Sequence, residues 1–222
     1  MTDAVEILRL SWETGEACFR EIAALHAAEI RHGALPLFGI GFLARLYREL
    51  ARTPGCGVWA AVRGDRVYGF LIGCVDLRAG FGAVLLRAGL PLLARAVPRL
   101  LRWKLLRKLP AVLLYPLQRS APAKTTQPAA DSDRSELLAI AVDPACRGEG
   151  VGRELVRRLE DFLCRHGAGS YRVTTNAADP SSNAFYRRLG FEPAGKVPHH
   201  ALCLQQYRKR LRVVLAPPAP AA

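Results

Sequence analysis

The sequence lacks any run of 18 or more apolar residues without a charge, so it predicts no membrane-spanning helix. It also lacks a Cys-x-x-Cys pair, and its six cysteines lie far apart, which argues against a zinc site or a disulfide scaffold. The first 16 residues carry acidic side chains and have no apolar core, so we expect no secretory signal. Because half of the residues are apolar, we expect a globular protein. Because the cysteines form no recognisable pattern, we expect reduced thiols, no metal and a cytoplasmic location.

Acidic residues are absent between Leu77 and Ala130, a stretch that holds ten basic residues. The formal net charge of the chain is +13, which leaves only +3 for all the other residues. The basic character therefore belongs to one segment and is not a property of the whole surface.

The stretch from Glu136 to Gly152 predicts a strand, a glycine-rich turn and a helix. Six of its first seven residues are apolar and the run ends at Asp143-Pro144, as in a buried strand. Glycines then allow a tight turn and a close approach to a ligand, and apolar residues recur at helical spacing between 153 and 166. The free amides and the positive dipole end of such a helix attract phosphate. No Gly-Lys-Ser/Thr follows and no Gly-x-Gly-x-x-Gly occurs, which excludes a P-loop and a dinucleotide fingerprint.

Two motifs carry a resemblance to a known family. The pattern Arg147-x-x-Gly150-x-Gly152 resembles the cofactor motif of the GNAT superfamily, the acyl-CoA-dependent N-acyltransferases. The segment from Ser181 to Phe191 contains Phe-Tyr, three residues and then Gly-Phe, which resembles the second motif of that family. The resemblance spans residues 135 to 196 and implies one α/β (α+β) domain, with a mixed, mostly antiparallel central sheet flanked by helices.

Upstream of the motifs, the order of elements is the one expected for the first half of a GNAT domain. The expected elements are a strand at 5–10, helices at 16–32 and 39–52, and a hairpin with strands at 58–62 and 66–75. Further strands are expected at 171–175, 190–196 and 202–207. We expect the domain to span 1–215, with an insertion at 77–134 that ends in a linker, and a disordered tail at 216–222.

The resemblance implies which residues bind acetyl-CoA. Backbone groups of Ile140, Ala141 and Val142 would contact the pantetheine arm, although plain core strand is the other interpretation. The pyrophosphate would be held by the amides of the turn, which are those of Arg147, Gly148, Glu149, Gly150, Val151 and Gly152. Arg153 would hold it as well. The family commonly has an asparagine seven residues before the tyrosine, where this chain has Asp179, so we expect Asn176 or Asn183 to substitute.

The reaction needs a base for the amine and a proton for the leaving thiolate. The resemblance assigns the acid to Tyr186, and the alternative is that this ring only packs a short helix against the sheet. Glu136 starts the central strand, where some family members place a catalytic glutamate, and the alternative is a solvated residue. His199 or His200 is a weaker choice for the base, since adjacent strand residues face opposite ways.

The resemblance therefore implies an N-acetyltransferase that moves an acetyl group from acetyl-CoA to a primary amine by direct attack in a ternary complex. A small amine, an amino sugar and a protein N-terminus remain open as acceptors, as do a longer acyl donor and a homodimer. The alternative functions are a CoA-binding module without catalysis and a basic scaffold at an anionic membrane or a nucleic acid.

The basic segment 79–119 allows two hypotheses. Arg95, Arg99 and Arg102 share one helical face, leucines cover the other, and Pro98 is expected to break the helix. In the first hypothesis the segment is an interfacial helix on anionic lipid, at the inner face of the membrane. In the second it is a helical hairpin that packs beside the acceptor site. Nucleic acid is not expected, because the segment has one tryptophan and one tyrosine amid many leucines.

Overall fold

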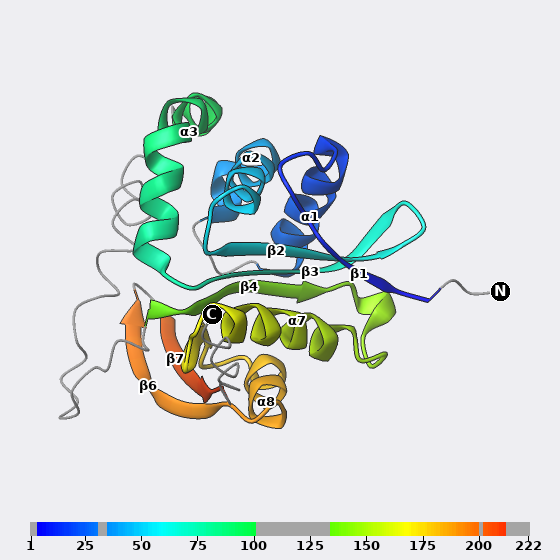
Figure 1. Ribbon diagram of the computed structural model, residues 1–222, viewed down its shortest axis with the longest axis vertical. Coiled ribbons are helices and arrows are strands. Elements are labelled where there is room, and N and C mark those ends of the chain that lie inside the picture. Colours follow the sequence, from blue (N-terminus) through cyan, green and yellow to red (C-terminus); the bar gives the residue numbers. More distant parts are fainter. Residues whose placement is uncertain (1–3, 31–34, 101–133, 200–201, 212–222) are drawn as a thin grey trace, which may run out of the picture.

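The computed structural model describes residues 4–30, 35–100, 134–199 and 202–211. Within them, seven strands form one sheet in the order β1-β2-β3-β4-β5-β7-β6, with helices on both faces (Figure 1). Neighbouring strands are antiparallel except β4 and β5, which are parallel. The expected α/β fold with a mixed, mostly antiparallel sheet is confirmed. No helix within these ranges is long and apolar enough to cross a membrane.

The first half of the chain forms three strands and the helices that cover one face of the sheet. Its elements are β1 (Glu6–Arg9), α1 (Glu16–Glu29), η1 (Leu35–Phe38), α2 (Ile40–Ala51), β2 (Cys56–Arg63), β3 (Arg66–Cys74) and α3 (Leu77–Leu100). The β2–β3 hairpin turns at Gly64, whose φ of 58° is readily adopted only without a Cβ. In α2, Leu43, Leu46 and Leu50 recur three and four residues apart and bury one face of the helix.

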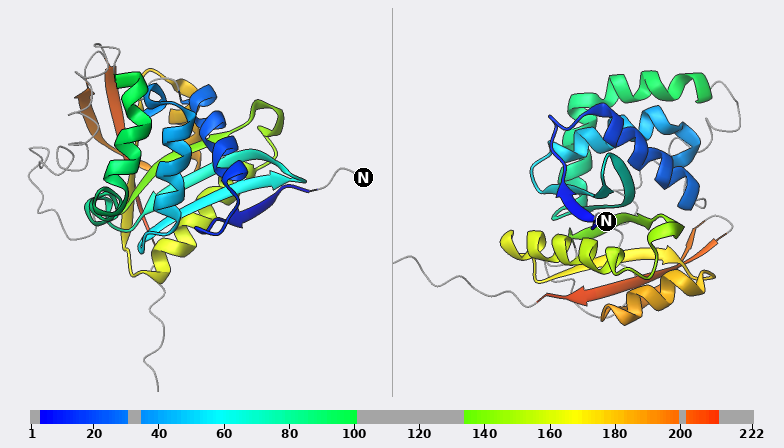
Figure 2. Two further views of the ribbon diagram at one scale, coloured as in Figure 1. Left: turned by 90° about the horizontal axis from the view of Figure 1, so that it is seen from above. Right: turned by 90° about the vertical axis from the view of Figure 1, so that its right-hand side faces the viewer.

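The second half contributes the remaining strands and the helices of the opposite face (Figure 2). Its elements are β4 (Glu136–Val142), η3 (Pro144–Cys146), α7 (Val151–Arg165), β5 (Ser170–Asn176), α8 (Pro180–Arg188), β6 (Glu192–His199) and β7 (Leu202–Arg210). The helix expected from residue 153 begins two residues earlier, which places Gly152 inside α7. The order β5-β7-β6 brings β7, the last strand, into the interior of the sheet.

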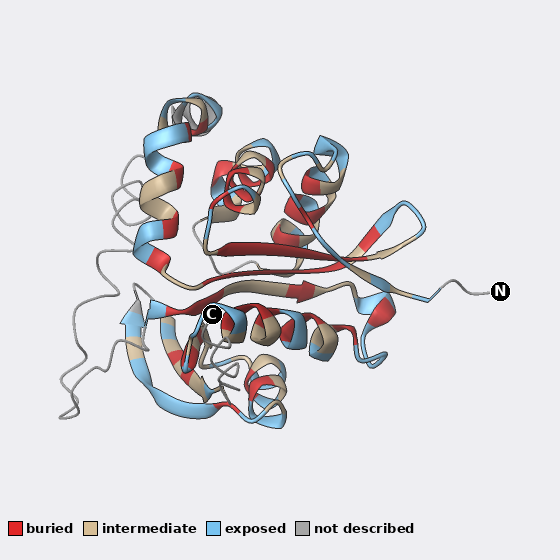
Figure 3. Cartoon of the chain, in the orientation of Figure 1, coloured by how far each residue is buried: buried red, intermediate tan, exposed pale blue. Residues whose placement is uncertain are grey.

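Two apolar clusters lie on the two faces of the sheet (Figure 3). Adjacent residues of β3 show the division, because successive strand side chains point to opposite faces. Phe70 belongs to the cluster with α1, α2 and α3, and Leu71 belongs to the cluster with α7 and α8. Each helical layer therefore has its own core, and the sheet between them is buried on both sides along β2, β3 and part of β4.

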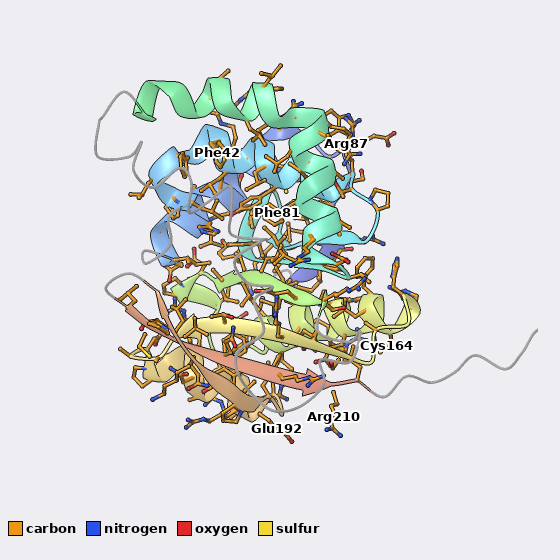
Figure 4. All side chains as sticks on the ribbon, turned by 90° about the vertical axis from the view of Figure 1, so that its left-hand side faces the viewer. Phe42, Phe81, Arg87, Cys164, Glu192 and Arg210 are labelled. Carbon is orange, nitrogen blue, oxygen red and sulfur yellow. The ribbon has the colours of Figure 1, made fainter. Side chains whose placement is uncertain are left out.

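Helix α3 runs unbroken from Leu77 through Pro91 and Pro98 to Leu100. The expectation that Pro98 breaks the helix is wrong. A proline removes one helical hydrogen bond and crowds the preceding turn, which kinks a helix, and Figure 4 shows α3 bent partway along. The helix packs on α2 and η1, so the insertion begins as part of the core. Its continuation at 101–119, the linker at 120–133 and the tail at 216–222 lie outside the described residues.

Candidate functional site

The central feature of the site is the point at which β4 and β5 separate. The two strands pair only at Glu136↔Arg172 and Leu137↔Val173. In the β3–β4 ladder, Ile72 pairs with Ala139 and Gly73 with Leu137, so Leu138 is an extra residue, a β-bulge. A bulge bends its strand, and here it falls where the β4–β5 ladder stops. Beyond it, β4 pairs with β3 and β5 pairs with β7, so the edges that face each other carry no ladder.

Ile140, Ala141 and Val142 lie on this open edge of β4. Ile140 and Val142 turn their backbone groups to the β5 side, where no strand pairs with them among the described residues, whereas Ala141 bonds to β3. The Val142 carbonyl accepts from Arg147 instead. An unpaired strand edge offers N–H and C=O groups to any extended chain that carries amides. The geometry therefore fits the predicted contact with the two amides of a pantetheine arm.

The glycine turn follows at the end of β4. The Asp143 carboxylate accepts a hydrogen bond from the Ala145 N–H at 2.9 Å and starts η3. Gly148 and Gly150 have φ angles of 88° and 83°, in the left-handed region that favours glycine. The amide of Glu154 donates to the Gly150 carbonyl at 3.0 Å, so the N–H groups of the preceding turn have no intrahelical acceptor. This exposed helix start fits an anionic group such as a pyrophosphate.

Two side chains of the turn are held by the rest of the fold. Arg147 donates from Nε to the Val142 carbonyl at 3.2 Å and from its guanidinium to the Glu29 carboxylate of α1. The Glu149 carboxylate accepts from Arg63 at 2.9 Å. Arg147 is therefore held at the turn by a carboxylate of α1, and its contact with a pyrophosphate stays a prediction. Arg153 is exposed on the first turn of α7 and has no ion-pair partner within the described ranges.

The two sequence motifs meet at Gly152. A Cβ built on this glycine would lie 3.1 Å from the Phe185 ring and 3.7 Å from a Val142 methyl group. Such a distance to an aromatic ring is tighter than a normal contact, so glycine permits the close packing of α7 on α8. Neither motif by itself shows this contact, which places Phe185 of α8 beside the start of α7.

Tyr186 is buried on the α8 side of the sheet. Its ring centroid lies 5.3 Å from Phe185, 5.4 Å from Phe191 and 5.8 Å from Tyr207. Burial, with a smaller contribution from the Asp179 carboxylate, raises the pKa of Tyr186 well above its usual value. No hydrogen bond between described residues uses its hydroxyl, so the O–H remains available to a ligand. The packing interpretation and a role toward a ligand both agree with this position.

Asn183 has a structural role, and its expected contact with the cofactor stays a prediction. Its side-chain amide donates to the carbonyls of Asn176, Ala177 and Asp179, and its carbonyl accepts from Tyr207 at 2.9 Å. The Asp179 carboxylate caps α8 by accepting from the amides of Ser181 and Ser182. The Asn176 side chain accepts from the Ala178 amide at 3.0 Å. These groups shape the β5–α8 connection and leave the Asn183 amide fully used.

Glu136 is 1% exposed and pairs with Arg172, with 3.1 Å between Oε2 and Nε. The alternative of a solvated glutamate at a strand start is therefore wrong, because the carboxylate is buried at the closed end of the splay. His199 ends β6, and His200 lies outside the described residues.

Sequence reasoning did not single out Arg172 or Thr174. Tyr171 and Val173 point to the α7 side, so Arg172 and Thr174 point to the other side of β5. The Thr174 hydroxyl is buried without a hydrogen-bond partner in the described part of the chain. It follows the last β4–β5 pair by one residue, so it stands where the splay opens. The only signal in the sequence was the polar alternation of β5, which is common on half-exposed strands.

Comparison with known proteins identifies a family. The model of the Acetyltransferase (GNAT) family matches residues 27–191. N-alpha-acetyltransferase RimI of Mycobacterium tuberculosis is 42% identical over 60 residues, which are 27% of this chain and 36% of that protein. Amino-acid acetyltransferase of Azotobacter vinelandii is 34% identical over 89 residues, which are 39% of this chain and 19% of that protein.

A solved structure agrees with the fold over nearly the whole chain. The protein yncA of Salmonella typhimurium, solved with its cofactor acetyl-CoA, superposes with a TM-score of 0.56. Its sequence identity is 16%, and the match covers 98% of this chain and 99% of that chain. Across the curated relatives, the matched stretch spans 17% to 36% of their length. The likeness to the solved structure therefore concerns the fold, and the likeness to the curated relatives concerns only part of their length.

Proposed function

Because this chain belongs to the GNAT acetyltransferase family, we propose that it moves an acetyl group from acetyl-CoA to a primary amine. The amine attacks directly, within a ternary complex. The observation that carries the proposal is the splay of β4 and β5 after Leu137↔Val173, which leads from a buried carboxylate to an exposed helix N-terminus.

The residues of the splay fit acetyl-CoA, which supplies the activated thioester carbon. The open edge of β4 from Ile140 to Val142 would pair with the amides of the pantetheine arm. The amides from Gly148 to Arg153 would hold the pyrophosphate, and the exposed Arg153 guanidinium adds a positive charge. Arg147 also fixes the end of β4 to α1.

We assign Tyr186 to the leaving sulfur. A thiol has an ordinary pKa of about 8.5, and burial raises the pKa of the Tyr186 hydroxyl above its usual value. Full transfer of the tyrosine proton to a thiolate is then uphill, whereas donation of a hydrogen bond to the developing negative charge is favourable. Tyr186 therefore acts as a hydrogen-bond donor to the leaving group, and the proton itself comes from the attacking amine or from water.

Glu136 is our candidate for the base. It lies at the closed end of the splay, on the acceptor side of β4, together with Arg172. The ion pair holds the carboxylate in place, and a water between it and the amine would carry the proton. Thr174 points to the same side with its unused hydroxyl, so it would hydrogen-bond the acceptor.

The acceptor class is proposed from the relatives, which include an amino-acid acetyltransferase and an N-alpha-acetyltransferase. A small amino acid and a peptide N-terminus both present the α-amine that such proteins acetylate. We propose an α-amine, acetylated in the cytoplasm, as the acceptor to test first.

The test is release of free thiol from acetyl-CoA in the presence of amines. The panel contains the twenty amino acids, an amino sugar and a short peptide with a free N-terminus, and calorimetry measures CoA affinity in parallel. Thiol release with one class of amine supports the proposal and names the acceptor. CoA binding without thiol release from any amine would instead identify a CoA-binding module. Absence of CoA binding would refute the assignment of the splay.

A further inference from the structure

Helix α3 has an outer face that no other described element covers. Leu86 is 90% exposed and Leu90 is 81% exposed, one helical turn apart on the same side of the helix. We call these two residues the α3 outer face. Isolated exposed leucines are ordinary, but a pair at this exposure on adjacent turns forms a continuous apolar strip.

The exposure does not arise from a loosely attached helix. Leu77, Val84, Ala88 and Leu92 on the inner side of α3 are each at most 5% exposed and belong to the core with α1 and α2. Figure 3 shows this division along the helix, with buried positions turned toward the molecule and exposed positions turned away. The α3 outer face is therefore held in a fixed orientation.

The charge around this strip has one sign. Arg78 and Arg87 are exposed and lie about 100° away on either side of the outer face, because each residue advances about 100° around a helix. Arg87 also donates a hydrogen bond to the Thr53 hydroxyl, just after α2, at 2.5 Å, and it is labelled in Figure 4. No acidic residue occurs from 77 to 130. The acidic residue just before α3, Asp76, caps the helix by accepting from the Ala79 amide.

We propose that the α3 outer face docks the protein on an anionic lipid surface. Leu86 and Leu90 enter the acyl boundary, and the flanking arginines meet the negatively charged headgroups. A second copy of this chain fits less well, because two surfaces of the same positive charge repel each other. The inference is independent of the proposed acetyl transfer.

The docked orientation leaves the cofactor site open. Figure 1 shows α3 at one end of the sheet and the start of α7 at the other, and the left-hand view of Figure 2 agrees. A membrane beneath α3 would therefore not cover the glycine turn, and acetyl-CoA from solution would still reach it.

The experiment is sedimentation of the full chain with two kinds of vesicle. One is made of phosphatidylcholine alone, and the other also contains the anionic lipid phosphatidylserine. We expect binding to the anionic vesicles at low salt and loss of binding as salt rises, because the Debye length falls. Leu86→Ser with Leu90→Ser should weaken binding about 10²-fold or more, since each leucine that leaves water contributes about tenfold or more. Leu8→Ser is the matched control, because Leu8 is 40% exposed on β1 at the far end of the sheet.

Deletion of 79–119 would be a poor test, because it removes buried residues of α3. The two serine substitutions lie at exposed positions, and an unchanged thermal melt confirms that the variant folds. The proposal fails if the wild type does not sediment at low salt, or if the serine pair binds as tightly as the wild type. It also fails if light scattering shows a dimer that the serine pair dissociates while vesicles bind neither protein. In that case the α3 outer face joins two copies of the chain.

Discussion

Replacing Gly150 by aspartate tests the cofactor site with the smallest cost to the fold. The ideal Cβ position on Gly150 has no atom within 4 Å, so the new side chain meets open space. Its φ of 83° costs a residue with a Cβ about 1–2 kcal/mol. Aspartate tolerates this region better than most residues, and at an N-cap it is better than glycine by only a few tenths of a kcal/mol. We therefore expect the free energy of unfolding to fall by about 1–2 kcal/mol.

The effect on CoA should be much larger. A carboxylate at Gly150 would stand about 4 Å from a bound phosphate, where two like charges repel by about 1 kcal/mol in bulk water and about 4 kcal/mol near a protein surface. This range corresponds to a loss of CoA affinity of about fivefold to 10³-fold, and we expect a value near the upper end because the helix start lies at a protein surface. Calorimetry measures the affinity, and a thermal melt measures the fold.

Two control variants separate charge from backbone strain. Gly150→Ala introduces the same strain without a charge, so it should lose far less affinity than the aspartate. Gly64→Asp introduces a charge at φ 58° in the β2–β3 turn, also in open space, and should leave CoA affinity unchanged. A folded Gly150→Asp protein with wild-type CoA affinity would refute the assignment of the glycine turn to the pyrophosphate.

Three further predictions concern catalysis and stability. Tyr186→Phe should lower kcat on the order of 10²-fold with a modest change in CoA affinity, and activity within about twofold of wild type in thiol-release kinetics would reduce Tyr186 to packing. Glu136→Gln should flatten the acidic limb of the pH–rate profile, and an unchanged limb would exclude Glu136 as the base. The same change should lower the free energy of unfolding in urea by about 1–3 kcal/mol, because Arg172 keeps a buried charge. Burial lowers the pKa of His26 to about 4, and its Nδ1 shares a hydrogen bond with the Tyr47 hydroxyl at 2.6 Å. The unfolded chain therefore binds its proton first, near pH 6.5, so stability should fall by about 2 kcal/mol from pH 7 to pH 5, and His26→Gln should show a smaller fall.

The sequence by itself determined the elements and the two motifs. Strands and helices were predicted because apolar periodicity, glycine and proline act over a few residues, as at Gly64 in the hairpin and Asp143-Pro144 after β4. The glycine turn was readable for the same reason, since both of its functions, a left-handed backbone and free amides, belong to the local chain.

Only the tertiary structure decided which side chains face the site. Arg147 and Asn183 carry the right functional groups, and Glu29 and Tyr207, distant in sequence, hold them in place. Burial of Glu136 likewise depends on Arg172, which a single sequence does not pair with it. Such contacts are formed by packing, where partner and distance have no local signature.

The prolines of α3 show that a local sequence rule can also predict a break that does not occur. A proline weakens a helix locally, and that rule predicted a break at Pro98. Instead α3 continues to Leu100, and Leu77, Val84, Ala88 and Leu92 bury one side of it against the fold. Burial of a leucine contributes about 1.5–3 kcal/mol, and the loss of one helical hydrogen bond to proline costs about 3 kcal/mol, so several buried residues outweigh the local cost. A local rule decides the structure of an element only where the free energy of tertiary packing does not outweigh the local preference.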